Sequence, residues 1–103
     1  MTYYEVIVQP RAEREIKEAH RFLATIAPAS AERWLNGISK AILTLEEMPE
    51  RCPLAPEAAH FARPIRQLIH DGYRILFHTT DRHVRVLTVR HCKRRPLKRK
   101  RPG

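Results

Sequence analysis

The stretch that decides the fold is residues 64–95, PIRQLIHDGYRILFHTTDRHVRVLTVRHCKRR. Asp71-Gly72 is a strong two-residue hairpin signal, because glycine adopts positive φ without steric cost and aspartate tolerates it. A second turn is expected near residues 80–82. The alternation of side chains around these two turns predicts three strands. They are expected at residues 64–70, 73–79 and 83–91.

Arginine side chains occur among the apolar residues of these strands. Apolar residues occupy both faces of each strand, which is typical of strands in the middle of a sheet. Four arginines nevertheless lie within the strands: Arg66, Arg74, Arg85 and Arg90. Because arginine is rarely fully buried without a partner, we expect one face of the sheet to carry a guanidinium cluster directed at an anionic group. In the last strand, simple alternation predicts Val84, Val86 and Thr88 on one face and Arg85, Leu87 and Val89 on the other.

The residues before Pro64 predict a strand and two helices. Residues 3–8 form an expected short strand. Apolar residues at intervals of three and four then predict helices at 11–27 and 29–48, joined closely enough to form an antiparallel hairpin. Gly37 is expected to allow close packing of helix on helix. The order β-α-α-β-β-β predicts an α+β fold, with the helical hairpin packed on an antiparallel sheet.

Residues 49–63 contain too many prolines for a continuous helix. We expect Leu54 and Phe61 to pin this segment to the core. No internal repeat or domain boundary is evident, so residues 1–97 are expected to form one domain.

The charge is concentrated at one end of the 103-residue chain. The net charge is +9, and residues 93–103, KRRPLKRKRPG, hold seven of the 20 Lys and Arg and no acid. Subtracting these seven charges from +9 leaves +2 for residues 1–92. Residues 98–103 are therefore either a solvated, disordered tail or a segment that binds nucleic acid or an acidic protein.

Composition also restricts the class of protein. No apolar run reaches the roughly 18 residues needed to span a bilayer, and the N-terminus lacks a signal-peptide pattern, so we expect a cytoplasmic protein that does not engage a membrane. Cys52 and Cys92 do not form a CxxC pair, and the His91-Cys92 pair does not match a usual zinc spacing. The sequence therefore indicates no metal site, no disulfide and no cofactor.

Four stretches together resemble the RelE/ParE superfamily of type II toxin–antitoxin toxins, in particular its plasmid-stabilisation branch. They are PRAEREIKEA, AERWLNGISKAI, PERCPLAPE, and RQLIHDGYRILF followed by VRVLTVRHCKRRPL. The resemblance covers residues 3–97. It implies a toxin that inhibits growth, is neutralised by a cognate antitoxin and forms a hetero-oligomer with it.

The resemblance leaves the target open. ParE-like members poison DNA gyrase, whereas RelE-like members cut mRNA on the ribosome. A metal-free ribonuclease needs a proton acceptor, a proton donor and cations that stabilise the transition state. Compared with RelE, the arginine positions match Arg74 and Arg94, but the two lysine positions fall on Ile65 and Gln67. No tyrosine follows Tyr73.

The missing lysines and tyrosine favour gyrase as the target. In the alternative, a mRNA endonuclease, Arg74 and Arg94 would stabilise the phosphate charge and His91 would move the proton. His78 is a second candidate for proton transfer. The alternative is that His91 only caps a strand and that His78 is structural. A third possibility is an inactive module that only binds its antitoxin or acts as a co-repressor.

Other basic residues are expected to bind the target or the antitoxin: Arg66, His78, Arg85, Arg90, Lys93 and Arg95. Arg66 and Arg85 could instead pair with Glu57. Trp34, at helical spacing, is expected in the core.

Overall fold

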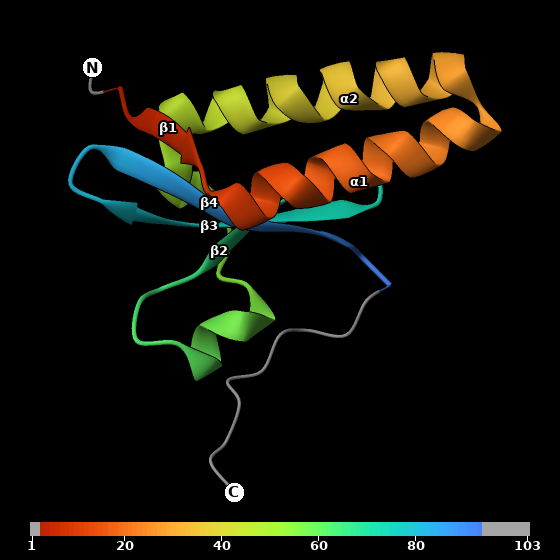
Figure 1. The fold of residues 1–103 in the computed structure, drawn as a ribbon. Helices are drawn as coiled ribbons and strands as arrows, with labels where there is room; N and C mark the ends of the chain where they lie inside the picture. The colour runs from red at the N-terminus through yellow and green to blue at the C-terminus, as the bar shows by residue number, and fades with distance from the viewer. Residues whose placement is uncertain (1–2, 94–103) are drawn as a thin grey trace, which may run out of the picture.

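The computed structural model describes residues 3–93 as two helices packed on a four-stranded sheet (Figure 1). The strands are β1 (Glu5–Val8), β2 (Arg66–His70), β3 (Tyr73–Thr80) and β4 (His83–His91), and the helices are α1 (Pro10–Ile26) and α2 (Pro28–Leu43). The sheet order is β1-β4-β3-β2. The predicted α+β architecture is confirmed.

The three predicted C-terminal strands pair as an antiparallel meander. Asp71 and Gly72 have φ of 47° and 80°, so both central residues of the β2–β3 turn have the positive φ of a type I′ turn. β1 lies on the other side of β4 and runs parallel to it, with Glu5 opposite His83 and Val8 opposite Val86. The sheet is therefore mixed, with β1 as a parallel edge strand.

Both helices begin at proline, whose missing N–H costs nothing in the first helical turn. α2 ends at Leu43, five residues before the predicted end at 48, and the chain tightens into a 3₁₀ turn at Thr44–Glu46. Arg51 holds this end, because its Nη1 donates to the Glu47 carbonyl at 2.8 Å and its Nη2 donates to the Thr44 hydroxyl at 3.0 Å. The apolar spacing that predicted a longer helix is still used, because Leu45 is fully buried.

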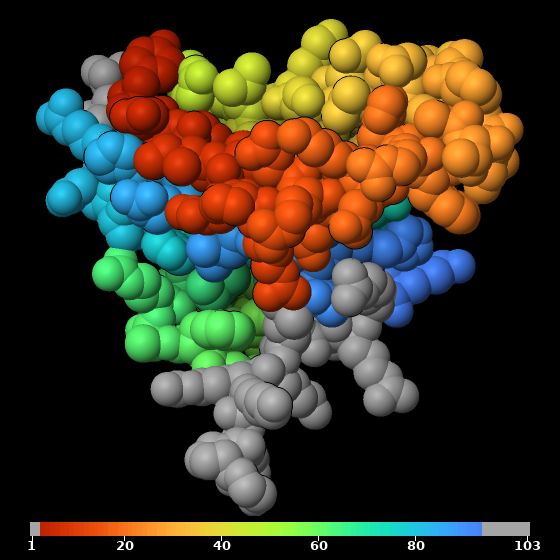
Figure 2. Space-filling model, viewed as in Figure 1, coloured from red at the N-terminus to blue at the C-terminus, as the bar shows by residue number. Residues whose placement is uncertain are grey.

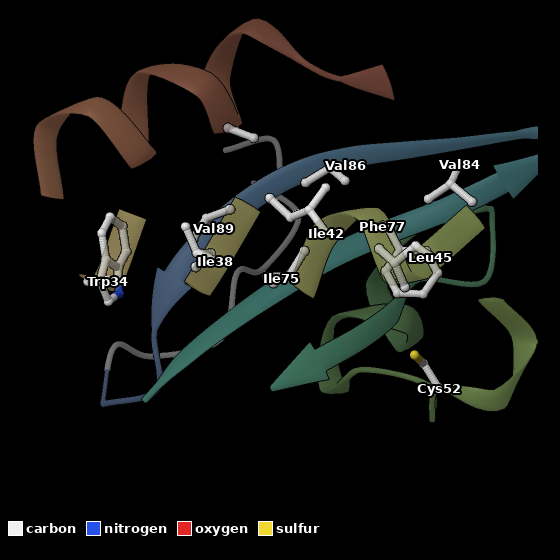
Figure 3. Packing of buried hydrophobic residues seen from close by; sticks show 11 residues of the cluster. Trp34, Ile38, Ile42, Leu45, Cys52, Ile75, Phe77, Val84, Val86 and Val89 are labelled. Carbon is white, nitrogen blue, oxygen red and sulfur yellow. The ribbon is translucent and has the colours of Figure 1, made fainter. Parts of the chain in front are cut away.

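The main core lies between α2 and the face of the sheet that the helices cover, which we call the near face (Figure 3). Trp34, Ile38 and Ile42 point from α2 toward the sheet, as predicted for Trp34. The strand residues that meet them are Ile75, Phe77, Val84, Val86 and Val89. Burial of these aliphatic and aromatic side chains is the main force that fixes the helices on the sheet.

Gly37 packs against the sheet, so the expectation of helix-on-helix packing is wrong. A Cβ at Gly37 would lie 2.9 Å from Nε2 of His70 on β2. The imidazole therefore occupies the space that a side chain at this position would need.

The proline-rich segment begins beside the main core, to which Cys52 belongs, and its part at Pro56–His60 lies on the opposite side of the sheet from the helices (Figures 1 and 2, green). It contains two 3₁₀ helices, Pro49–Arg51 and Pro56–His60. Leu54 and Phe61 are exposed, so the prediction that they pin it is wrong. Ala55 instead packs with Ile65 and Leu76 in a second apolar cluster, and the Ala55 N–H donates to the Ile65 carbonyl at 2.8 Å. Between residues 3 and 93, no helix is both long and apolar enough to cross a membrane.

Candidate functional site

The far face of the sheet, on the side away from the helices, gathers most of the predicted basic residues. Pairing sets Arg74 opposite Arg90 and His78 opposite Arg85, and directly paired residues of neighbouring strands share a face. Arg66 is opposite Phe77, whose side chain is in the main core, so Arg66 belongs to the near face. The four arginines therefore do not form one cluster, which corrects the expectation from sequence. Arg66 instead donates from Nη1 to the Cys52 carbonyl at 2.7 Å.

A bulge in β4 explains why Arg85 and Arg90 share the far face although they lie five positions apart, an odd number. The register shifts between Leu76 and Phe77, which pair with Thr88 and Val86, so Leu87 is the additional residue. The simple alternation expected from sequence is therefore wrong beyond Leu87. Val89 enters the main core, and Thr88 shares the face of Leu76.

Glu15 of α1 holds the bulge in place. One of its carboxylate oxygens accepts hydrogen bonds from the Thr88 hydroxyl at 2.6 Å and from the Val89 N–H at 3.1 Å. β1 pairs with β4 only as far as Val86, so Glu15 satisfies a backbone donor just beyond the end of that pairing.

A buried ion pair lies on the far face, near the start of β3. Arg74 donates from Nη1 to Glu57 Oε1 at 2.9 Å and from Nη2 to Glu57 Oε2 at 2.5 Å, and Nη1 also donates to Gln67 Oε1 at 2.9 Å. Glu57 is 0% exposed and Arg74 is 7% exposed. Hydrogen bonding to Glu57 raises the pKa of Arg74 above its ordinary value. This two-bond geometry is the strongest form of arginine–carboxylate contact.

Glu57 was considered from sequence only as a partner of Arg66 or Arg85, and its pairing with Arg74 was missed. The signal was weak but present. Glu57 is the one charged residue in the stretch from Pro53 to Ala59, among prolines, alanines and a leucine. An acid in such an apolar segment requires a cationic partner if the segment packs on the sheet.

A cavity of about 450 Å³ opens beside this ion pair. Half of its lining residues are apolar, namely Phe61, Ala62, Ile65, Leu76 and Leu87. Polar residues complete it: Arg11, Glu57, Arg63, His78 and Thr88. The cavity joins β3, β4, the segment before β2 and the start of α1.

His78 contributes an imidazole to this cavity. Desolvation, together with the positive charges of Arg63 and Arg85, lowers the pKa of His78 below its ordinary value. Its buried Nδ1 has no hydrogen-bond partner among the described residues. His78 is therefore neutral near pH 7, with its Nδ1 buried.

His91 lies away from Arg74. It is opposite Tyr73, whose ring is 5.1 Å from Trp34 of α2, and the His91 ring meets Tyr73 edge-on at 5.2 Å. Its Nδ1 accepts a hydrogen bond from the Lys93 N–H at 3.1 Å. The structure therefore places His91 with the aromatic residues of the near face and Arg74 on the far face, while Arg94 and Arg95 lie outside the described residues.

Across residues 3–93, no group of three or more His, Cys, Asp or Glu side chains is placed to hold a metal ion. The far face carries guanidinium, imidazole and aliphatic groups, and its Glu57 carboxylate is paired with Arg74. Such a set can bind an anionic, partly apolar ligand.

The sequence matches the family model described as the ParE toxin of the type II toxin–antitoxin system parDE, over residues 6–96. No curated protein matches the chain. Among solved structures, the chain is similar to one from the chromosomal ParDE toxin–antitoxin system of P. aeruginosa. The TM-score is 0.74 at 10% identity, and the match covers 88% of this chain and 98% of the other.

A second similar structure comes from the RelBE2 toxin–antitoxin complex of Mycobacterium tuberculosis. The TM-score is 0.62 at 23% identity, with coverage of 87% and 99%. At these identities the structural matches establish the fold, and the family model covers most of the sequence. The chain therefore belongs to the ParE toxin family of type II toxin–antitoxin systems.

Proposed function

We propose that this toxin inhibits growth in the cytoplasm by poisoning DNA gyrase, and that a cognate antitoxin neutralises it. The observation that carries the choice of target is the state of Arg74. Its guanidinium is buried and bound by the Glu57 carboxylate and the Gln67 amide. A cation that stabilises a scissile phosphate must be able to contact it.

Three further positions support a non-enzymatic toxin. Ile65 and Gln67 occupy the places where RelE carries lysines, and Ile65 is buried against Leu76 while Gln67 binds Arg74. His91 belongs to the face opposite Arg74. The residues proposed for RNA cleavage thus do not converge, whereas general acid–base catalysis needs its groups within hydrogen-bond reach of one substrate.

The antitoxin is proposed from the family and from charge. The similar structures come from toxin–antitoxin systems, and this chain carries a net charge of +9. An acidic partner would associate with it faster at low salt than at high salt. For such contacts we propose Arg85, Lys93 and Arg95, of which Arg95 is placed by the sequence alone. Arg90, which is opposite Arg74, is only 5% exposed.

A ribosome-dependent mRNA endonuclease is the second candidate. One observation favours it: the lowered pKa of His78 gives a neutral imidazole on the same face as Arg74. A neutral imidazole is the form that accepts a proton. In this candidate, His78 or His91 would move the proton, and Arg74 and Arg94 would stabilise the charge.

The two candidates separate in one set of measurements. Induction of the toxin without antitoxin should stop growth, and the purified chain should inhibit supercoiling by gyrase without producing new mRNA ends. Cleavage of mRNA in ribosomes with unimpaired supercoiling would overturn the gyrase proposal. His91→Ala should then lower cleavage about 10²-fold or more, with nearly unchanged antitoxin affinity, if His91 moves the proton. A chain that binds antitoxin but never inhibits growth would be an inactive co-repressor.

A further inference from the structure

We propose that the far-face cavity anchors an acidic segment of the antitoxin, which inserts one bulky apolar side chain between Ile65, Leu76 and Leu87 and places carboxylates on the surrounding arginines. The proposal rests on the proposed function, because it requires an antitoxin. It adds the place of contact and the chemistry of the segment.

The floor of the cavity selects an apolar group. Ile65 and Leu76 are almost fully buried, and Leu87 is the bulge residue that lies beside them. The Thr88 hydroxyl is already used, because it donates to Glu15. A volume of about 450 Å³ accommodates a leucine or phenylalanine side chain. Removing such a side chain from water supplies the binding free energy.

The rim selects negative charge. Arg11 and Arg63 line the cavity, and Arg85 is opposite His78. Among residues 3–93, neither Arg63 nor Arg85 takes part in an ion pair, and Arg11 is 3.7 Å from Glu15. The carboxylate of Glu57 also lines the cavity, but Arg74 neutralises it. The rim therefore offers guanidinium groups to a ligand.

The same features favour a peptide over a nucleic acid. Sequence-tolerant binding of single strands relies on aromatic rings on which bases stack. The lining contains only the rings of Phe61 and His78, whereas its floor is aliphatic.

A direct test uses the full chain with isotope-labelled methyl groups and short capped peptides. Addition of acetyl-Glu-Glu-Leu-Glu-Glu-amide should shift the methyl resonances of Ile65, Leu76 and Leu87. The shifts should shrink when alanine replaces the central leucine or lysine replaces the glutamates. The proposal is overturned if the peptide leaves these resonances unchanged, or if oligothymidylate shifts them more than the peptide does.

A second test uses the antitoxin protein that neutralises growth inhibition. Ala62→Trp fills the mouth of the cavity, and Arg63→Glu reverses a rim charge. Ala62→Trp should weaken antitoxin binding about 10- to 100-fold, since one buried side chain is worth that factor. Arg63→Glu should weaken it about 10-fold or more, because it places like charges against each other. The matched controls are Ala59→Trp on the same segment and Arg21→Glu on α1, both exposed and outside the cavity. They should bind like the wild type.

The outcomes separate this inference from the proposed function. If the wild-type chain neither stops growth nor binds an antitoxin, the proposed function fails. If the wild type binds and all four variants bind equally well, only the cavity proposal fails. Ala62 and Arg63 are exposed, so their variants should fold, and circular dichroism checks this. Should Ala62→Trp misfold, Arg63→Glu decides.

Discussion

The buried ion pair gives the sharpest prediction for stability. Replacing Glu57 by leucine removes both carboxylate contacts of the buried Arg74 guanidinium and leaves the Gln67 amide oxygen as an acceptor for Nη1. Removing one partner of a buried pair typically costs about 3–5 kcal/mol, because the remaining charge is uncompensated. In a domain of this length, that loss lowers Tm by roughly 12–25 °C.

Two further variants test whether the lost stability comes from a buried charge without its partner. Arg74→Met should destabilise the chain similarly, because it leaves the Glu57 carboxylate buried. The double variant Glu57→Leu/Arg74→Met should recover to within about 1 kcal/mol of the wild type, because an apolar pair of similar size needs no charge compensation. Glu13→Leu is the matched control. Its pair with Lys17 is exposed at 3.2 Å and is worth about 0.5 kcal/mol or less.

Urea unfolding followed by Trp34 fluorescence measures the free energy of unfolding of the wild type and of all four variants. The reasoning would be refuted if Glu57→Leu unfolded within 1 kcal/mol of the wild type. It would also fail if the double variant were as unstable as the sum of the two single variants. The second result would mean that the far face needs the charges themselves.

Three other outcomes follow from single contacts. Glu15→Ala removes the acceptor of the Val89 N–H and should cost about 1–3 kcal/mol, with faster hydrogen exchange at Val89; protection equal to the wild type would contradict this. Because the folded pKa of His78 lies below its unfolded value of about 6.5, the folded state loses stability as pH falls through that value. The urea midpoint should drop less between pH 7.5 and 5 in His78→Gln than in the wild type, and an equal drop would remove His78 as the cause. Gly37→Ala should raise the free energy of unfolding by nearly the full helix-propensity difference of about 1 kcal/mol in a His70→Ala background, and by less in the wild type. A double-mutant cycle measures this difference, and additive effects would show that the His70 imidazole moves aside without cost.

Local signals predicted most of the fold. The Asp71-Gly72 turn predicted the β2–β3 hairpin, and it formed as expected. Prolines marked both helix starts. The end of α2 was missed because Leu45 continues the helical spacing, while a side chain beyond the helix, Arg51, holds the tightened turn. That contact involves residues several positions apart and leaves no periodic pattern.

The candidate site was harder to predict because its decisive contacts join distant residues. The run of apolar residues around Leu87 reads equally well with or without a bulge, so sequence could not reveal which face holds Val89. Arg74 was correctly singled out as a strand arginine, but Glu57, 17 residues earlier, decides what it binds. The proposed roles of Arg74, His78 and His91 remain predictions for the experiments above.

The parallel pairing of β1 with β4 also constrains the timing of synthesis. Glu5 is opposite His83, so 78 residues must be added before the first strand can meet its neighbour. At about 5–20 residues per second, translation takes about 4–16 s to cover that interval. The Glu15 carboxylate likewise waits 73 residues for Thr88. The helical hairpin can form early from local contacts, but the sheet cannot close until its last strand leaves the ribosome. A nascent chain therefore lacks the far face until β4 has left the ribosome, and an antitoxin that recognised this face would bind only toxin whose sheet had closed.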